Sequence, residues 1–287
     1  MRADYIRRRW RGGTWSGAAL ALLILAGCNG LHNPREDFGK TYYLDGAGNW
    51  GYGVATVPEG LRQAKYQGDV EVFIWTSSFN PAVDQINILG NKLRAGLLSG
   101  KIQDYLRRHP ENDVNLIALS AGTGIATWAV EGLSGDYKVT NLVLLGSSLS
   151  YDYDMTKALS HMRGDVYVYY SPHDEVLTTG ARALGTVDRK YVDGAGLSGL
   201  RPNGRSSPRV KNIPWNHRYS ALGWTGAHTD ATSQAFVREV ISRHILPETA
   251  PRKRVRRGVA GITDQPLTPD VLVSAVFPTQ LYHTSEH

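Results

Sequence analysis

The sequence predicts an α/β fold: a doubly wound, mainly parallel sheet of about six strands, with helices covering both of its faces. Short runs of apolar residues recur along the chain, and amphipathic helical patterns separate them. This alternation is sustained through the central part of the 287 residues. Strands that alternate with helices in this way form βαβ units, whose strands lie parallel in one sheet.

The predicted strands are short and largely apolar. A continuous apolar run indicates a strand that is covered on both faces, as in a parallel sheet. The last of the six is the weakest, because it contains charged and polar residues (RVKNIPW). In chain order, the predicted strands cover residues 41–45, 70–76, 114–119, 139–145, 165–170 and 209–215.

The predicted helices carry apolar residues at a spacing of three or four. In residues 91–109 this spacing places Leu98 and Ile102 on one stripe of the helix surface. Residues 122–133 show the same pattern, and so do residues 231–245. The three helices lie between or after predicted strands, as a doubly wound sheet requires.

The N-terminus has the features of a bacterial signal peptide. Five arginines precede an apolar run at residues 16–27, which is shorter than the roughly 20 residues that cross a bilayer. The run ends in Leu-Ala-Gly before Cys28, the only cysteine of the chain, and this ending resembles the lipobox of bacterial lipoproteins. We expect removal of residues 1–27, acylation of Cys28 and a place in the bacterial cell envelope, anchored to the membrane and facing the periplasm or the exterior. The alternative is an uncleaved anchor followed by a cysteine without a role.

The rest of the chain divides into one large domain and two polar ends. Residues 28–40 are short and polar and are predicted to be a tether, and residues 41–246 are predicted to form the α/β domain. Residues 247–287 contain five prolines and no sustained apolar periodicity. We expect them to form a flexible, basic tail.

The net charge of +6 is concentrated at the two ends of the chain. Residues 1–27 carry +4 and residues 247–287 carry +1, which leaves +1 for residues 28–246. Nucleic-acid binding needs a concentrated basic surface. The balanced charge of the central domain therefore argues against a nucleic-acid partner.

The strongest motif lies where the predicted strand 114–119 runs directly into the predicted helix 122–133. The sequence at this junction is Ala118-Leu-Ser120-Ala-Gly122, with a small residue two positions before and two after the serine. In so tight a strand–turn–helix junction, larger flanking residues would collide with neighbouring elements, and the serine hydroxyl is exposed at the edge of the sheet. The helix N-terminus behind it favours the negative charge of an oxyanion. Ser120 is therefore the candidate nucleophile.

A serine nucleophile works with a histidine base and with a carboxylate that orients the base. Asp174 follows the predicted strand 165–170 and is the candidate acid, with Glu175 as its competitor. His228 lies on the loop ahead of the last predicted helix and is the candidate base. His217 is the alternative, because it closely follows the weak sixth strand.

An oxyanion hole needs backbone N–H donors near the nucleophile. Ala121 would supply one, because it directly follows Ser120. The glycine-rich loop at residues 45–51 would supply the second from Gly46 or Ala47, since glycines let a backbone approach a substrate closely; its alternative interpretation is a plain turn. Beyond this loop, the sequence shows no phosphate-binding glycine motif and no spacing of metal ligands. We therefore expect neither a cofactor nor a metal.

In the order and placement of these residues, the chain resembles a compact α/β hydrolase over residues 41–246, without that fold's first two strands. It departs from the family at Ala118, where glycine is usual, at Asp45, where the oxyanion loop usually has histidine, and in a loose segment at residues 185–208. The resemblance implies a serine hydrolase that cleaves an ester or thioester of a small molecule or a polymer through an acyl-enzyme. An acyltransferase with the same triad, and a non-catalytic envelope lipoprotein on the same fold, are the alternatives.

The connection between two central strands suggests how accessible such a site would be. About 19 residues separate the strand ending at Leu145 from the strand starting at Asp165. This is too short for the helical lid of many lipases. We expect an open, cutinase-like site whose aromatic wall includes Trp50, Trp75 or Trp224.

Overall fold

The computed structural model describes residues 33–76 and 78–246. The predicted signal peptide, its acylation site Cys28 and the predicted tail at 247–287 lie outside the described residues. The predictions made for those three segments stay predictions.

The last part of the predicted tether belongs to the fold, which is a difference from the sequence-based expectation. A 3₁₀ helix, η1 (Pro34–Phe38), packs against the domain, and the first strand begins at Lys40. The Lys40 ammonium group lies 3.0 Å from Glu36 Oε1 and 2.6 Å from Asp69 Oδ2. The charged residues that predicted a solvated tether are thus paired with one another, which allows this segment to pack.

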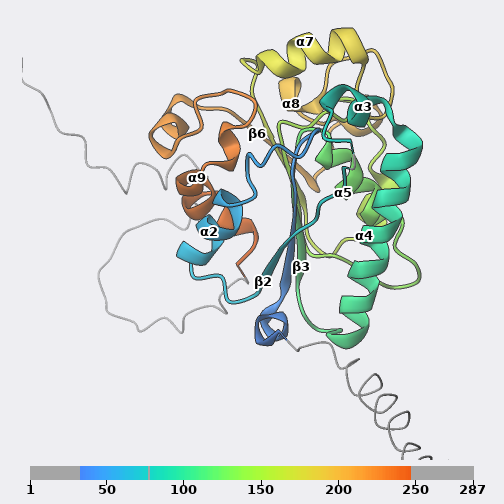
Figure 1. Ribbon diagram of the computed structural model, residues 1–287, viewed down its shortest axis with the longest axis vertical. Coiled ribbons are helices and arrows are strands. Elements are labelled where there is room, and N and C mark those ends of the chain that lie inside the picture. Colours follow the sequence, from blue (N-terminus) through green and yellow to red (C-terminus); the bar gives the residue numbers. More distant parts are fainter. Residues whose placement is uncertain (1–32, 77, 247–287) are drawn as a thin grey trace, which may run out of the picture.

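The six strands form a single sheet in which every neighbouring pair is parallel, so the predicted α/β fold is confirmed. The order across the sheet is β2-β1-β3-β4-β5-β6 (Figure 1). The strands are β1 (Lys40–Leu44), β2 (Asp69–Val72), β3 (Val114–Leu119), β4 (Leu142–Leu145), β5 (Val166–Tyr170) and β6 (Val210–Pro214).

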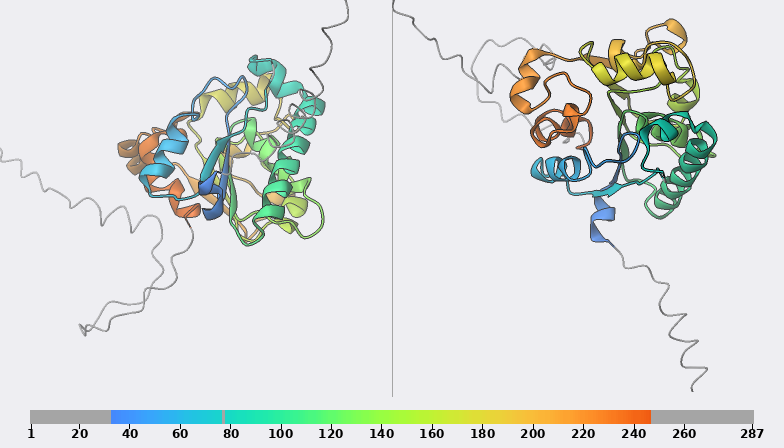
Figure 2. Two further views of the ribbon diagram at one scale, coloured as in Figure 1. Left: turned by 60° about the horizontal axis from the view of Figure 1, so that its bottom comes forward. Right: turned by 45° about the horizontal axis from the view of Figure 1, so that its top comes forward.

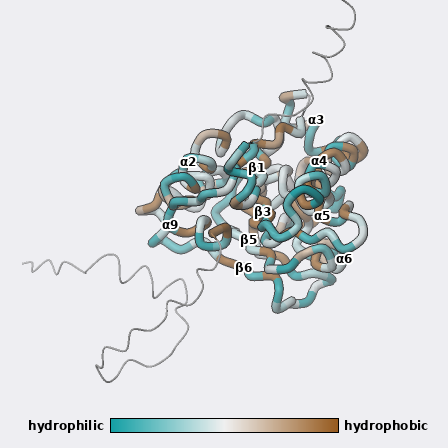
Figure 3. Tube along the Cα trace, turned by 90° about the horizontal axis from the view of Figure 1, so that it is seen from below, coloured by the Kyte–Doolittle hydropathy of each residue, from teal (hydrophilic) through white to brown (hydrophobic). Residues whose placement is uncertain are grey.

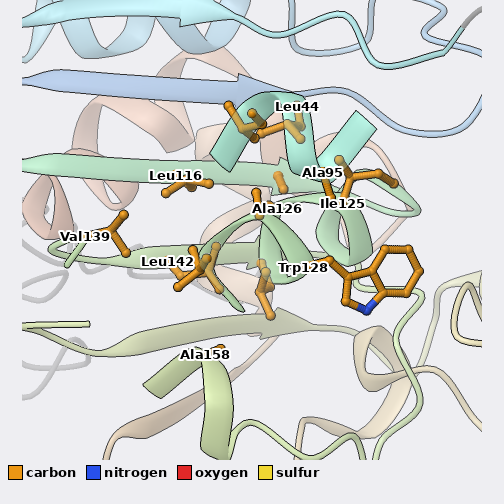
Figure 4. Close-up of a cluster of buried hydrophobic side chains, with 14 of the residues drawn as sticks. Leu44, Ala95, Leu116, Ile125, Ala126, Trp128, Val139, Leu142 and Ala158 are labelled. Atoms are coloured by element: carbon orange, nitrogen blue, oxygen red, sulfur yellow. The ribbon is translucent and has the colours of Figure 1, made fainter. Parts of the chain in front are cut away.

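Alternate residues of the central strands enter two separate hydrophobic clusters, one on each face of the sheet. Leu116 and Leu142 belong to one cluster, and their chain neighbours Ile117 and Val143 belong to the other. Figure 4 shows the first cluster, with Leu116 and Leu142 on two strands of the sheet and with Ile125, Ala126 and Trp128 of the helix that covers this face. The continuous apolar runs in the sequence follow from this arrangement, because both faces of each central strand are buried.

Helices cover both faces of the sheet. The helices α4 and α5 lie on one face, and α2 and α9 lie on the other (Figure 3). Within the described part of the chain, no helix has both the length and the apolar character to cross a membrane. The helices are α2 (Thr56–Gln63), α3 (Pro81–Ile86), α4 (Ile88–Arg108), α5 (Gly122–Glu131), α6 (Thr156–Ser160), α7 (Glu175–Leu184), α8 (Ala195–Ser198), α9 (Gln234–Glu239) and the 3₁₀ helices η2 (Pro202–Gly204), η3 (His217–Leu222), η4 (Asp230–Thr232) and η5 (Ile241–His244).

The prediction of one continuous helix over residues 231–245 is wrong. The segment consists of three short pieces, η4, α9 and η5. At Ser233 the backbone is extended (φ −58°, ψ 139°), and the side-chain oxygen donates a 2.7 Å hydrogen bond to the carbonyl of Leu222. The apolar spacing is real, because Phe236 and Ile241 are buried. The helical ladder breaks because the serine side chain bonds outside it.

The strand β2 ends at Val72, four residues before the predicted end at residue 76. Beyond it the chain turns inward at Trp75, whose indole N–H donates a 2.8 Å hydrogen bond to the carbonyl of Asp45. The aromatic residues that extended the predicted strand therefore fill the core next to the end of β1. Phe73 still donates a 2.8 Å backbone hydrogen bond to Tyr43 of β1, so the pairing fades one residue after the strand ends.

The strand order places a crevice at one edge of the sheet. After β1 the chain crosses to β2 on one side, whereas β3 lies on the other side of β1, so the loops that follow β1 and β3 diverge. In open parallel sheets, ligands bind at the carboxyl ends of the strands at such a switch point. Figures 1 and 2 show α3 and α7 at this same end of the sheet.

Candidate active site

Ser120 occupies the sharp turn between β3 and α5. Its φ of +51° lies in the left-handed region, which a residue other than glycine occupies at a cost of about 1–3 kcal/mol. The turn is held by backbone contacts: Ser120 N–H donates a 3.0 Å hydrogen bond to Leu145 of β4, and Thr123 N–H donates one of 3.0 Å to the Ser120 carbonyl. The predicted strand–turn–helix at this serine is therefore present.

The residues two positions before and after Ser120 are packed as tightly as the motif requires. Gly122 has no room for a side chain, because an added Cβ would collide with the backbone oxygen of Asp45. Ala118, where glycine is usual in the family, is fully buried in the hydrophobic cluster that α5 covers. Its methyl group is therefore accommodated in the core, and this departure does not disturb the turn.

Asp174 and His228 form a buried pair. Asp174 Oδ2 lies 2.6 Å from His228 Nδ1, and the two side chains are 2% and 9% exposed. Asp174 follows β5 and caps α7, because its Oδ1 accepts a 2.9 Å hydrogen bond from Leu177 N–H. Both carboxylate oxygens are therefore occupied, and the side chain has a fixed orientation towards the imidazole.

This pairing sets the histidine tautomer. An ionised carboxylate can only accept hydrogen bonds, so the Nδ1 of His228 must carry the proton that it donates to Asp174. In the neutral ring, Nε2 then keeps its lone pair and can accept a proton. In this tautomer, Nε2 is the atom of His228 that can act as a general base.

The pair packs beside the turn that carries Ser120. Gly146 directly follows Leu145, to which Ser120 is hydrogen-bonded, and it has φ +49°. An added Cβ at Gly146 would lie 3.3 Å from His228 Nδ1 and 3.4 Å from Asp174 Oδ2. A glycine is needed there so that the acid–base pair can approach the sheet edge. Among the described residues, His228 has its side-chain hydrogen bond with Asp174 and none with Ser120 Oγ.

The competing residues are placed differently. Glu175 is exposed at the first turn of α7. His217 is exposed at the start of η3, and the structure gives it no contact with Asp174. The carboxylate is thus paired with His228 rather than with the alternative base. The catalytic roles of Ser120, Asp174 and His228 stay predictions that this geometry supports.

Three backbone N–H groups near the turn are free to bind an oxyanion. Within the described part of the chain, Ala121, Gly46 and Ala47 donate their N–H groups to no protein atom. The Gly46 backbone lies against the turn, because an added Cβ there would be 3.3 Å from Ser120 Cβ. These are the predicted donors, and their role stays a prediction.

Asp45, which stands where the family usually has histidine, organises this loop instead of weakening it. The fully buried carboxylate accepts hydrogen bonds from Gly51 N–H (2.7 Å), Tyr52 N–H (3.2 Å) and the Tyr43 hydroxyl (3.0 Å). Burial and the neighbouring Asp45 carboxylate raise the pKa of Tyr43 well above its ordinary value, so the phenol keeps the proton that it donates. The loop is therefore tied to the end of β1.

A second buried carboxylate, Asp84 of α3, holds the other side of the same loop. Its Oδ2 accepts a 2.8 Å hydrogen bond from Gly48 N–H, and its Oδ1 accepts one of 2.8 Å from Ser78. This role could not be predicted from the sequence, because an isolated aspartate in a short helix matches no motif. The loop conformation near Ser120 thus depends on α3 as well as on β1.

A cavity of about 280 Å³ lies beside Ser120, between α3 and α7. The expectation of an open site is therefore wrong in part. The connection between β4 and β5 is short, as predicted, but the cavity walls come from two other helices, one before α4 and one after β5. The sequence signal that could have revealed the second wall is the stripe Val176, Gly180 and Leu184, spaced by four residues along α7.

The predicted aromatic wall is also wrong, because none of the three tryptophans lines this cavity. Trp75 and Trp224 are 1% and 2% exposed and belong to the two hydrophobic clusters. Trp50 is 62% exposed, and its indole N–H donates a 3.2 Å hydrogen bond to the Phe79 carbonyl. In the described residues, no group of three or more histidine, cysteine or acidic side chains is arranged to hold a metal ion.

No protein-family model matches the sequence, and no curated protein matches it. Similar solved structures include a cutinase-like protein from Cryptococcus sp., at 14% identity and a TM-score of 0.36, covering 72% of this chain and 95% of that one. The NocB thioesterase domain from the nocardicin cluster is 14% identical at a TM-score of 0.32, covering 72% and 94%. RedJ, solved with a PEG molecule in its active site, is 13% identical at a TM-score of 0.33, covering 65% and 84%.

Proposed function

We propose that this protein is a serine hydrolase of the α/β-hydrolase type, which cleaves an ester or thioester through an acyl-enzyme on Ser120. The observation that carries the proposal is the buried Asp174–His228 pair, joined at 2.6 Å beside the strained turn at Ser120. Buried charged groups are uncommon without a function or a full set of partners. A carboxylate that orients a histidine next to a strained serine is the arrangement that acyl transfer uses.

The proposed reaction follows from the donors and acceptors of the site. Ser120 Oγ attacks the carbonyl carbon as its proton moves to His228 Nε2, and the carbonyl oxygen becomes an oxyanion. The backbone N–H of Ala121 and that of Gly46 or Ala47 stabilise this charge. His228 then gives the proton to the leaving oxygen or sulfur, and the bond from the carbonyl carbon to that atom breaks. A water molecule, deprotonated by His228, releases the acid and regenerates Ser120.

The test of this function is ester turnover by the purified protein. The Ser120→Ala variant should lose about 10⁴-fold or more in kcat on p-nitrophenyl esters, because triad members act as a unit. Ser160→Ala is the matched control, since Ser160 is exposed at the end of α6 and does not line the cavity. Equal activity of the two variants would contradict the proposal. Product analysis with an added alcohol distinguishes hydrolysis from acyl transfer to that alcohol.

We also propose that the protein is exported and held in the bacterial cell envelope by a lipid on Cys28. Support comes from the basic and apolar segments at residues 1–27 and from Leu-Ala-Gly before the only cysteine. The Cys28→Ser variant should be released from membranes on cell fractionation. A wild-type protein that retains residues 1–27 by mass spectrometry would contradict this proposal.

A further inference from the structure

The cavity beside Ser120 has apolar walls. The loop after β1 contributes Ala47, α3 contributes Pro81 and Ala82, and α7 contributes Val176 and Leu177. No charged side chain lines it in the described part of the chain. An uncharged, apolar group is the ligand that such walls favour, because burial of apolar surface is the driving force for binding.

Two polar side chains of the wall, Gln85 and Thr186, are hydrogen-bonded to the protein itself. Gln85 of α3 donates a 3.0 Å hydrogen bond to the carbonyl of Gly185, which follows α7. Thr186 donates one of 3.1 Å to the Lys190 carbonyl. The first bond joins the two helical walls of the cavity. These two groups therefore shape the cavity, whereas Ser148 Oγ, which also lines it, has no hydrogen-bond partner in the described residues and stays available to a polar atom of the ligand.

The position of the cavity indicates which part of a substrate it holds. This step rests on the proposed function, in which His228 protonates the leaving group. The leaving atom must lie at the imidazole, yet His228 does not line the cavity, whereas Ser120 and Ala47 do. The group on the other side of the reacting carbonyl, the acyl chain, is therefore the part that extends between α3 and α7.

The volume limits the length of this chain. A cavity of roughly 150 Å³ holds a benzene molecule, or about 25 Å³ for each carbon. The 280 Å³ beside Ser120 thus has room for about ten carbons. Val176 lines the cavity and is 58% exposed, so the cavity has an apolar mouth as well as an apolar interior.

Gly180 is the glycine of the α7 wall. It lies on the face of α7 that lines the cavity, four residues from both Val176 and Leu184. A Cβ added at Gly180 would meet no atom within 4 Å, so the space in front of it is empty. Glycine in a helix interior is unfavourable by about 1 kcal/mol relative to alanine. The helix thus has a residue of low helix propensity at a position of the cavity wall that has open space in front of it.

We propose that the cavity between α3 and α7 binds the acyl chain of a medium-chain ester, of up to about ten carbons, and that Gly180 determines its length. A leucine at this position would fill the space of about four carbons. Each methylene that no longer fits should lower kcat/KM about fourfold.

The experiment compares Gly180→Leu with Gly96→Leu on p-nitrophenyl esters from acetate to decanoate. Gly96 is an exposed glycine of α4 whose added Cβ would also meet no atom, so this control matches the gain in helix propensity without touching the cavity. Gly180→Leu should keep wild-type kcat/KM on acetate and lose at least about tenfold on decanoate. Gly180→Ala should lie between the two, and it preserves the test if the leucine variant folds poorly. An unchanged chain-length profile in both Gly180 variants would overturn the inference.

A second readout separates this inference from the proposed function. Decanoate should raise the Tm of the wild type and of Gly96→Leu, because a ligand stabilises the state that binds it. It should raise the Tm of Gly180→Leu much less. Absence of any such rise overturns the acyl-chain inference even if a fluorophosphonate labels Ser120. Stabilisation by decanoate without labelling of Ser120 supports the cavity assignment and refutes the hydrolase proposal.

Discussion

Replacing Asp174 by asparagine separates two roles of this carboxylate. Its Oδ1 accepts the hydrogen bond from Leu177 N–H that caps α7, and its Oδ2 lies 2.6 Å from His228 Nδ1. Asparagine caps helices about as well as aspartate, so the bond to Leu177 can persist. The amide nitrogen that replaces Oδ2 can only donate, so it favours the tautomer in which His228 Nδ1 is unprotonated.

The expected consequence is a large loss of activity with a small loss of stability. In the changed tautomer, His228 Nε2 carries the proton and cannot accept one from Ser120. The loss in kcat should approach the value of about 10⁴ that follows from a wrong histidine tautomer. The free energy of unfolding should change by less than about 1 kcal/mol, since the cap and the packing are kept.

The matched variant is Asp174→Ala, which removes both interactions. It should lose activity to a similar degree, and it should also lose about 1 kcal/mol for the cap and about 1–3 kcal/mol for the unpaired, buried His228. Urea unfolding and p-nitrophenyl ester hydrolysis measure the two effects separately. If Asp174→Asn keeps more than about a tenth of wild-type kcat, the tautomer argument is refuted.

Three further predictions concern other residues. His228→Ala should lower ester turnover as far as Ser120→Ala does, whereas His217→Ala should change kcat little. A large loss in His217→Ala and a small one in His228→Ala would identify His217 as the base. Asp84→Ala removes the acceptor of Gly48 N–H and should lower kcat about tenfold with little change in KM. Asp84→Asn should keep most of the wild-type kcat. Equal losses of kcat in the two variants would assign Asp84 a structural role only. Burial lowers the pKa of His244 from 6.5 to about 4. Because the unfolded chain binds the extra proton, the free energy of unfolding should fall by up to about 3 kcal/mol as the pH falls from 6.5 to 4, and His244→Phe should abolish this dependence in urea unfolding.

The sequence predicted the sheet well because the central strands are buried on both faces. Residues 114–119 form β3 with the predicted bounds, since every one of these side chains is buried and no polar position breaks the run. The weak sixth strand is present as β6, at the edge of the sheet, where only Val210 is buried. Lys211 and Asn212 of this strand are exposed, which is why its apolar signal is faint. Ser120 and Asp174 could be proposed because a parallel sheet brings the ends of its strands together, and His228 because it lies on the loop ahead of the last predicted helix.

What the sequence did not reveal depends on contacts between distant segments. The cavity walls, α3 and α7, are short, and their apolar residues face a space whose other side is formed elsewhere in the chain. The hydrogen bond from Gln85 to the Gly185 carbonyl joins residues about a hundred positions apart, so no local sequence pattern predicts it. The role of the buried Asp84 carboxylate also has no sequence pattern, because its hydrogen bond from Gly48 N–H forms only once the loop is folded. Trp75 and Trp224 were predicted as substrate contacts because large aromatic side chains occur both in hydrophobic cores and in binding sites, and the sequence does not distinguish the two.

The most direct test of the proposed hydrolase is to identify the residue that a fluorophosphonate modifies. The wild type and Asp174→Asn would be incubated with the probe, digested, and mapped by mass spectrometry. The proposed mechanism predicts one adduct, on Ser120 Oγ, formed at a much lower rate in Asp174→Asn because His228 no longer accepts the serine proton. An adduct on another serine, or equal rates for the two proteins, would contradict the assignment of Ser120, His228 and Asp174 as a catalytic unit.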